Sequence, residues 1–136
     1  MALNTQIADA TVNAQADALG TLCDAGYINI YDGTQPATAD TATAVGNTLG
    51  VTLTFGQTAF AAANSGLLTA EAITSGTAVA AITPTWARIF TVDDVVVMDV
   101  SAGATGCNLT IGPFTAGTVV SATSFTHDVR NSTSGY

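Results

Sequence analysis

Few residues of this sequence could do acid–base or nucleophilic chemistry, and its single histidine, His127, is the first candidate. Asp128 follows it, and a histidine oriented by a carboxylate is the base that commonly activates a serine or cysteine nucleophile. Every such set would have to use His127. Its place in "SFTHDVRNS", close to the carboxyl terminus, favours a mobile, solvent-exposed imidazole instead. We therefore expect no catalytic residues.

Metal ligands are also sparse. Cys23 and Cys107 have no CxxC spacing and no histidine beside them, so they do not form a zinc set. Whether they form a disulfide stays open, although buried free cysteines are the commoner outcome. Asp93 and Asp94, with Asp99, could hold a cation weakly, but an adjacent aspartate pair is most simply the polar corner of a hairpin. We expect no metal site.

Cofactor motifs are missing as well. A phosphate-binding loop of the Walker type needs a lysine, and the sequence contains none. "SAGATG" lacks the glycine spacing of a dinucleotide site, and there is no GxSxG elbow. A carboxylate pair for glycoside hydrolysis is disfavoured because Glu71 is the only glutamate. The sequence therefore predicts a protein without cofactor or enzymatic activity.

The charge balance limits the partners. Two basic residues face ten acidic ones, which gives a net charge of −8, so a nucleic-acid backbone or an anionic lipid surface would not be bound. Charged residues make up only 9% of the chain, whereas about 25% is typical, and alanine and threonine fill more than a third. A surface with so few charges and so many small side chains is typical of a protein whose faces are covered by neighbouring subunits.

The chain length fits a single domain over residues 1–136, and residues 1–25 carry helical periodicity. Asn4 or Thr5 could cap the helix, and Gly26 could end it. Asp9, Asp17 and Asp24 fall on one face, which we interpret as solvated. The expected apolar stripe consists of Ile7, Ala10, Ala14, Ala18 and Leu22. This amino-terminal segment has neither the basic start nor the apolar run of a secretory signal, so folding in a cytoplasm is expected.

After Gly26 the period changes to two. Residues 26–129 read as about eight short strands, including "LGVTLTF", "QTAFAAA", "TAVAAIT" and "WARIF". Regular turn signals between them predict a mainly β fold, an antiparallel β-sandwich of jelly-roll or immunoglobulin-like type behind the helix. Residues 130–136 are expected to form a carboxy-terminal tail.

The turn-rich run after "YINIY" is the best candidate for a contact loop. Asp32-Gly33 tolerates a positive φ, and Pro36 holds Gln35 extended, so this excursion should be stiff. Whether it contacts another chain or is only a structural corner stays open. The expected subunit-contact loop consists of Tyr31, Asp32, Gly33, Thr34, Gln35 and Pro36.

Two residues of "PTWARIFTV" are expected to be packing or interface anchors. Trp86 is more readily a packed aromatic than a ligand platform, and Arg88 should pair with an aspartate of its own chain or of a neighbour. With Phe90 they should share one strand face, leaving Ala87 and Ile89 on the other.

Three long stretches within about residues 19–129 form a recognisable pattern: "GYINIYDGTQPATADTATAVGNTLGVTLTF", "GLLTAEAIT" and "WARIFTVDDVVVMDVSAGATGCNLTIGPFTAGTVVSATSFTHDV". Together they resemble a family of small virion proteins of tailed bacteriophages. Ala87 and Cys107 depart from the family pattern, which has an aromatic residue and frequently an aspartate there, and no glycine follows Asp99. The most specific matches are Tyr31, residues 33–37, Asp40, Trp86, Arg88, Ala116-Gly117 and Phe125-Thr126.

The resemblance implies a non-enzymatic virion component. Within the virion we expect a capsid decoration, or cement, protein on the exterior of the head, bound to the major capsid protein and self-associated as a homotrimer. A tail, neck or fibre-associated protein is the alternative, and a secreted adhesion module or a hydrolase would be hypotheses of other classes.

Overall fold

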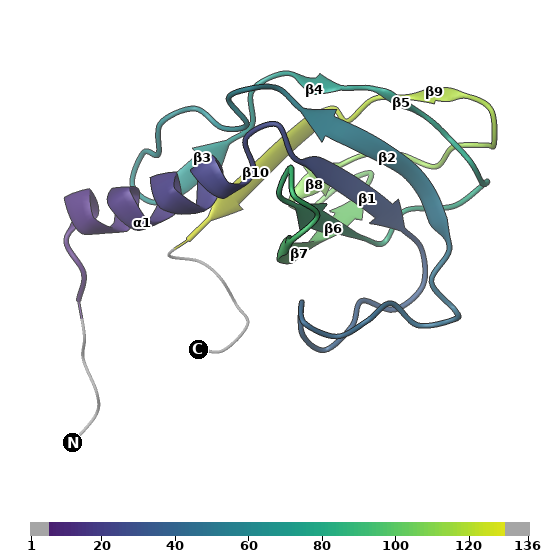
Figure 1. The fold of residues 1–136 in the computed structure, drawn as a ribbon, viewed down its shortest axis with the longest axis horizontal. Helices are drawn as coiled ribbons and strands as arrows, with labels where there is room; N and C mark the ends of the chain where they lie inside the picture. Colours follow the sequence, from purple (N-terminus) through teal and green to yellow (C-terminus); the bar gives the residue numbers. More distant parts are fainter. Residues whose placement is uncertain (1–5, 130–136) are drawn as a thin grey trace.

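The computed structural model describes residues 6–129, which begin with one helix, α1 (Asp9–Leu22), and continue as short strands. The predicted tail (130–136) and the predicted caps Asn4 and Thr5 lie outside the described residues. Figure 1 shows α1 beside a strongly curled sheet. The strands are β1 (Tyr27–Tyr31), β2 (Leu49–Phe55), β3 (Leu67–Thr69), β4 (Ile73–Thr74), β5 (Gly76–Thr77), β6 (Trp86–Phe90), β7 (Val96–Gly103), β8 (Leu109–Thr110), β9 (Val119–Val120) and β10 (Ser124–Asp128).

The fold is mainly β, as predicted, but its principal sheet is mixed. Eight strands follow the order β3-β10-β8-β7-β6-β1-β2-β4, and β5 pairs with β9 separately. The β7–β8 pair is parallel, so the expectation of a wholly antiparallel arrangement is wrong. The loop between β7 and β8 brings the chain back beside β7, where the Asn108 amide donates to Ser101 Oγ at 3.0 Å. Directly after this bond, Ala102 pairs with Leu109 and Gly103 pairs with Thr110.

The core lies inside the curl of this sheet. Phe55 of β2 and Phe125 of β10 have ring centroids 6.2 Å apart, although β8, β7, β6 and β1 separate their strands in the sheet. Phe60 contacts both rings, at 5.6 Å and 5.3 Å. The two ends of the sheet therefore face each other across one apolar interior, which excludes water and provides the main folding force.

The helix packs on the sheet with a face that differs from the predicted one. Val12, Ala16 and Gly20 are buried, whereas the predicted stripe is solvent-exposed, with Ile7 at 48% and Leu22 at 55%. Both stripes have helical spacing, and in an alanine-rich helix the apolar contrast between them is small. Tertiary contacts decided between them: a Cβ added at Gly20 would lie within 3.6 Å of Phe60 and Leu68.

Side chains beside this packed face hold the segment after β2. Asp24 Oδ1 accepts the Ala59 amide at 2.8 Å, Asp17 Oδ1 accepts the Ala63 amide at 2.7 Å, and Asn13 Oδ1 accepts the Gly66 amide at 2.8 Å. Asp9 and Asp17 are exposed, as expected of a solvated face, whereas Asp24 is half-buried, and Asp17 and Asp24 also bind backbone amides, which the sequence did not indicate. Because a coil needs acceptors for its amides, these side-chain oxygens replace the pairing that a strand would give.

That segment and the one after β4 are less regular than expected. "QTAFAAA" forms only an isolated bridge between Phe60 and Ala70, and "TAVAAIT" contributes only Thr77 to β5. The hairpin between β6 and β7 is confirmed, with Asp93 and Asp94 at its corner. Asp94 has a φ of 65°, which the short polar side chain tolerates. No helix among residues 6–129 is long and apolar enough to cross a membrane.

Candidate interaction site

The outer face of the central strands carries aromatic and polar side chains in register. Tyr27 lies opposite Phe90 and Tyr31 lies opposite Trp86, and both pairs stack, with centroids 4.8 Å and 4.7 Å apart. Asn29 and Arg88 are paired between them. The predicted alternation along β6 is confirmed, because Ala87 and Ile89 belong to the core cluster on the opposite face.

Arg88 makes a two-pronged ion pair with Asp99 on the neighbouring strand. Arg88 Nε lies 2.7 Å from Asp99 Oδ1, and Nη2 lies 2.8 Å from Oδ2, with the two side chains only 6% and 3% exposed. The expected pairing with an aspartate is thus confirmed within the chain. The hydrogen bonds to Asp99 raise the pKa of Arg88, and the negative charge of Asp40 adds to this effect. Arg88 and Asp99 therefore neutralise each other within the pair.

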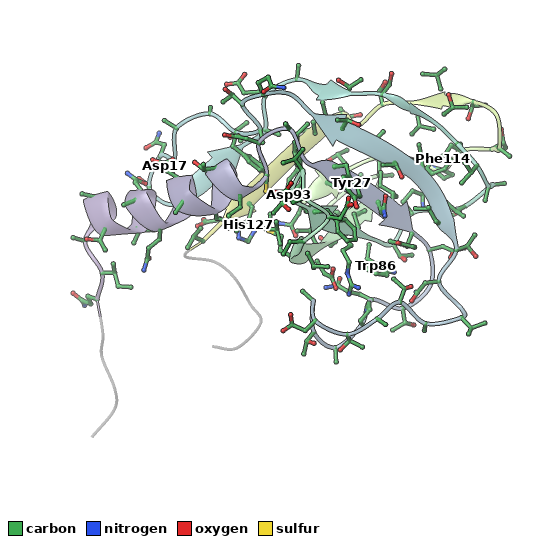
Figure 2. The ribbon with its side chains drawn as sticks, in the orientation of Figure 1. Asp17, Tyr27, Trp86, Asp93, Phe114 and His127 are labelled. Atoms are coloured by element: carbon green, nitrogen blue, oxygen red, sulfur yellow. The ribbon has the colours of Figure 1, made fainter. Side chains whose placement is uncertain are left out.

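Trp86 is completely buried, although it lies on the outer face. Its indole Nε1 donates to the Asp32 carbonyl at 3.2 Å, its ring stacks on Tyr31, and the Arg88 guanidinium lies 5.4 Å from its centroid. Trp86 is therefore a packing anchor that ties the sheet to the connection between β1 and β2. Figure 2 shows its position close to that connection.

The connection at residues 32–48, here called the β1–β2 loop, is fixed at its base. Asp32 Oδ1 accepts the Thr48 amide at 2.7 Å, and Thr85 Oγ1 donates to the Gly33 carbonyl at 2.7 Å. Asn47 Nδ2 donates to the carbonyls of Asp32 and Thr34, at 3.0 Å and 2.9 Å. Several of these bonds join residues 32–34 to residues 47–48, so the two ends of the loop are held together.

Gly33 is required at this base. Its φ is +78°, and a Cβ there would lie 2.8 Å from the Gly46 carbonyl oxygen and 2.9 Å from Asn47 Nδ2. The inference that Asp32-Gly33 supplies a positive φ is confirmed, since glycine adopts this conformation without steric cost. Beyond the base, residues 40–46 are exposed, and Val45 is fully exposed. Figure 1 shows this loop, in blue, between the ends of β1 and β2.

A groove opens beside the loop base, with a volume of about 510 Å³. Asp32 and Gly33 form one wall, and the rest is formed by Ala81, Ile82, Thr83, Thr85, Pro113 and Phe114. Its side chains are small or apolar apart from Asp32 and two threonines. We call this cavity the loop-base groove.

The apolar end of the loop-base groove depends on a missing side chain in β2. A Cβ at Gly50 would lie 2.4 Å from Ile82 Cδ1 and 2.7 Å from Phe114 Cζ. Gly50 thus lets both side chains rest directly on the strand. Ile82 and Phe114 also form a backbone bridge, with each amide donating to the other carbonyl at 3.2 Å. Figure 2 places Phe114 on the side of the sheet that carries β5 and β9.

The structure brings together most of the predicted site. Tyr31, Asp32 and Trp86 contact one another at the loop base, Arg88 lies next to Trp86, and Gly33 closes the turn. Thr34 contributes its carbonyl, whereas Gln35 is exposed and Pro36 half-buried in the outgoing chain. Sequence reasoning missed Asn47 and Phe114. An asparagine in "VGNT" and an aromatic residue inside the turn signal "GPF" were the available clues.

The remaining reactive side chains lie elsewhere. His127 lies in β10, half-buried and paired with Leu68, so the expectation of a mobile, exposed imidazole is wrong. Burial lowers its pKa. Both cysteines are free, and burial raises the pKa of Cys23 to about 12. Within residues 6–129, histidine, cysteine and acidic side chains form no group of three or more that could hold a metal ion.

The chain was compared with protein-family models, with curated proteins and with solved structures. No family model, curated protein or solved structure matches it. A functional proposal therefore has to rest on the sequence itself and on the geometry of the loop and its groove.

Proposed function

We propose that this chain is a non-enzymatic structural protein of a bacteriophage virion. In this proposal it is a decoration protein on the exterior of the head, which binds the major capsid protein as a homotrimer and stabilises the shell. It rests on the resemblance of the sequence to small virion proteins of tailed phages and on the physical character of the β1–β2 loop.

One observation carries the proposal. The β1–β2 loop is fixed at its base to the sheet by Trp86 and Thr85, yet its outer part exposes small side chains and Val45. A rigid loop loses little conformational entropy when it docks, so contacts of small side chains can still give useful affinity. On a shell with many identical sites, the modest affinity of each arm of a trimer adds through multivalency.

The charge distribution supports the same role. Ten acidic residues oppose two basic ones, which keeps a free protein soluble before assembly. Because one basic residue, Arg88, is already paired with Asp99, the described surface offers almost only negative charge to a partner. A shell surface with basic patches would therefore be the complementary one.

The finer description of the fold belongs to this proposal. We infer that the curled sheet works as a β-sandwich of jelly-roll or immunoglobulin-like type. The support is that β2 and β10 face each other across one core through Phe55 and Phe125. A closed body of this kind leaves loops at its ends free for contacts.

Electron microscopy of the virion tests the proposal. Density for this chain on the outer head surface, at threefold or quasi-threefold positions, is the expected result. Density confined to the tail, neck or fibres would replace it with the alternative role in those structures. Density in neither place would exclude a structural role in the virion.

A protein gel of purified particles gives an independent check. A decoration protein should approach the copy number of the major capsid protein, whereas a tail or neck component should be present in far fewer copies. A measured hydrolase activity that disappears in His127→Ala would contradict the non-enzymatic role.

A further inference from the structure

We propose that the loop-base groove binds an extended segment of a basic partner chain. In this binding mode an apolar side chain of that segment lies against Phe114 and Ile82, and a lysine or arginine next to it meets Asp32. This inference rests on the proposed function, and it adds the docking surface and the chemistry of the partner.

The groove has the dimensions and lining of a segment-binding site. Its volume is about 510 Å³ and it is open to solvent, which suits an extended segment better than a small enclosed ligand. Ala81, Ile82, Pro113 and Phe114 give it an apolar end, and Asp32 stands at the other wall. The two walls are fixed, because Thr85 of one wall donates to Gly33 of the other at 2.7 Å. A preformed groove of this kind does not have to be ordered when its partner binds.

Asp32 can bind a cation without leaving its place. Its Oδ1 accepts the Thr48 amide and its backbone carbonyl accepts the Trp86 indole, so the residue is held at the groove wall. An ionised carboxylate has about four acceptor sites on two oxygens, and a single amide leaves capacity for an ammonium or guanidinium group. Among residues 6–129, Asp32 is the one charged residue that lines the groove.

Charge selects a basic partner over a second copy of this chain. Each copy has a net charge of −8, so a second copy would bring mostly negative charge to Asp32 in this groove, and the proposed homotrimer would have to form through other surfaces. A copy has two basic side chains, and one of them, Arg88, is buried against Asp99. A basic segment of a different protein meets neither obstacle, and we therefore assign the groove to a shell protein.

The experiment measures docking of the full chain to purified heads of the phage that encodes it, after this protein has been stripped from them. Thr83→Arg places a long cation in the groove, and Thr58→Arg makes the same change at an exposed threonine outside it. We expect Thr83→Arg to weaken docking at least about tenfold, as for the loss of a strong contact residue, and Thr58→Arg to leave it unchanged. A circular dichroism melt of each variant reports its folding.

Two further measurements test the chemistry of the partner. Asp32→Asn keeps an oxygen for the Thr48 amide but removes the charge, so docking should weaken a few-fold and depend less on salt. Docking of the wild-type chain should itself weaken as the salt concentration rises, because screening reduces attraction between opposite charges. Docking that is insensitive to salt would exclude a basic partner.

The other outcomes are distinguishable. If the wild-type chain docks and both arginine variants dock equally well, the groove is not the contact and the proposed function is unaffected. If the wild-type chain does not dock to heads, the proposed function falls, and the inference with it. If light scattering shows that Thr83→Arg alone changes the oligomeric state, the groove holds a second copy, and the assignment to a basic partner is wrong.

Discussion

The two faces of the central strands are built on different physical principles. The inner face of β1 and β6 carries Ile28, Ile30 and Ile89, all fully buried and all aliphatic. The outer face of the same strands carries two stacked aromatic pairs and the Arg88–Asp99 ion pair. Both faces are well packed, but only the contacts on the outer face require a particular orientation of the side chains.

This difference separates folding from positioning. Aliphatic burial is non-directional and contributes roughly in proportion to the area removed from water. Hydrogen bonds, ion pairs and stacked rings tolerate only narrow geometries, so they fix how neighbouring segments lie. We infer that the inner face supplies most of the stability, whereas the outer face sets where the β1–β2 loop stands.

The largest effect is expected from Asp99→Ala on the outer face. It would leave the guanidinium of Arg88 buried without its partner, and such a loss costs about 3–5 kcal/mol of the free energy of unfolding. Urea denaturation measures this. Asp93→Ala, at the exposed hairpin corner, is the control and should change stability by less than about 0.5 kcal/mol. If the two substitutions lowered the free energy of unfolding equally, the Arg88–Asp99 ion pair would not be needed for stability.

Ile30→Ala should cost about 2–4 kcal/mol, because it opens a cavity in the core below β1. Unlike Asp99→Ala, it should leave the chemical shifts of the loop base unchanged in the folded protein. The comparison of the two faces fails if Ile30→Ala displaces the loop as much as Asp99→Ala does. Val45→Ala, at a fully exposed position, is a matched control with little expected effect.

Asn47→Ala tests whether the loop is held locally. Three hydrogen bonds of its side chain would be lost, to the carbonyls of Asp32 and Thr34 and from the Ala44 amide. Because these groups can bond to water instead, the expected global cost is only about 1 kcal/mol. Hydrogen exchange should accelerate within residues 40–48 and stay slow in β1. Thr43→Ala, an exposed neighbour, should change neither.

The smallest effect is expected from Tyr27→Phe, which keeps the stack on Phe90 but loses the 2.8 Å hydrogen bond to Asp94. The cost should be about 0.5 kcal/mol near neutral pH. Desolvation, with the bond to Asp94, raises the pKa of Tyr27 above its ordinary value of 10.0. This contribution is therefore present below pH 10 and is lost as the pH rises through the raised pKa.

An ultraviolet titration of the tyrosines should show one group that ionises late in the wild type and is missing in Tyr27→Phe. A stability difference between the two proteins that grows above pH 10 would contradict the sign of this linkage.

Part of the candidate site could be read from the sequence. "YINIY" and "WARIF" alternate with period two, so their face assignment needed no tertiary information. The turn at Asp32-Gly33 could also be predicted locally, since the positive φ of Gly33 depends only on the residue type at that position. The turn signals around Phe114 and Asn47 were visible, but the roles of these residues could not be assigned, because they depend on segments more than ten residues away.

The helix shows where local patterns stop being informative. Two stripes of similar polarity were available, and the one that packs is the one whose residues fit Phe60 and Leu68 and whose polar neighbours meet unpaired amides. His127 was misplaced for a related reason. Its strand is defined by pairing with β3, a segment nearly sixty residues earlier.

Local sequence patterns predict the mainly β character, the two faces of β1 and β6, the hairpin at Asp93-Asp94 and the stiff turn at Gly33. These features arise from steric and hydrophobic preferences within a few residues. Contacts between distant segments set which helix face is buried, which aspartate pairs with Arg88, how β8 joins the sheet in parallel, and that a groove opens beside the loop. Each of those features depends on which distant segments meet, and local sequence preferences do not distinguish between the possible pairings.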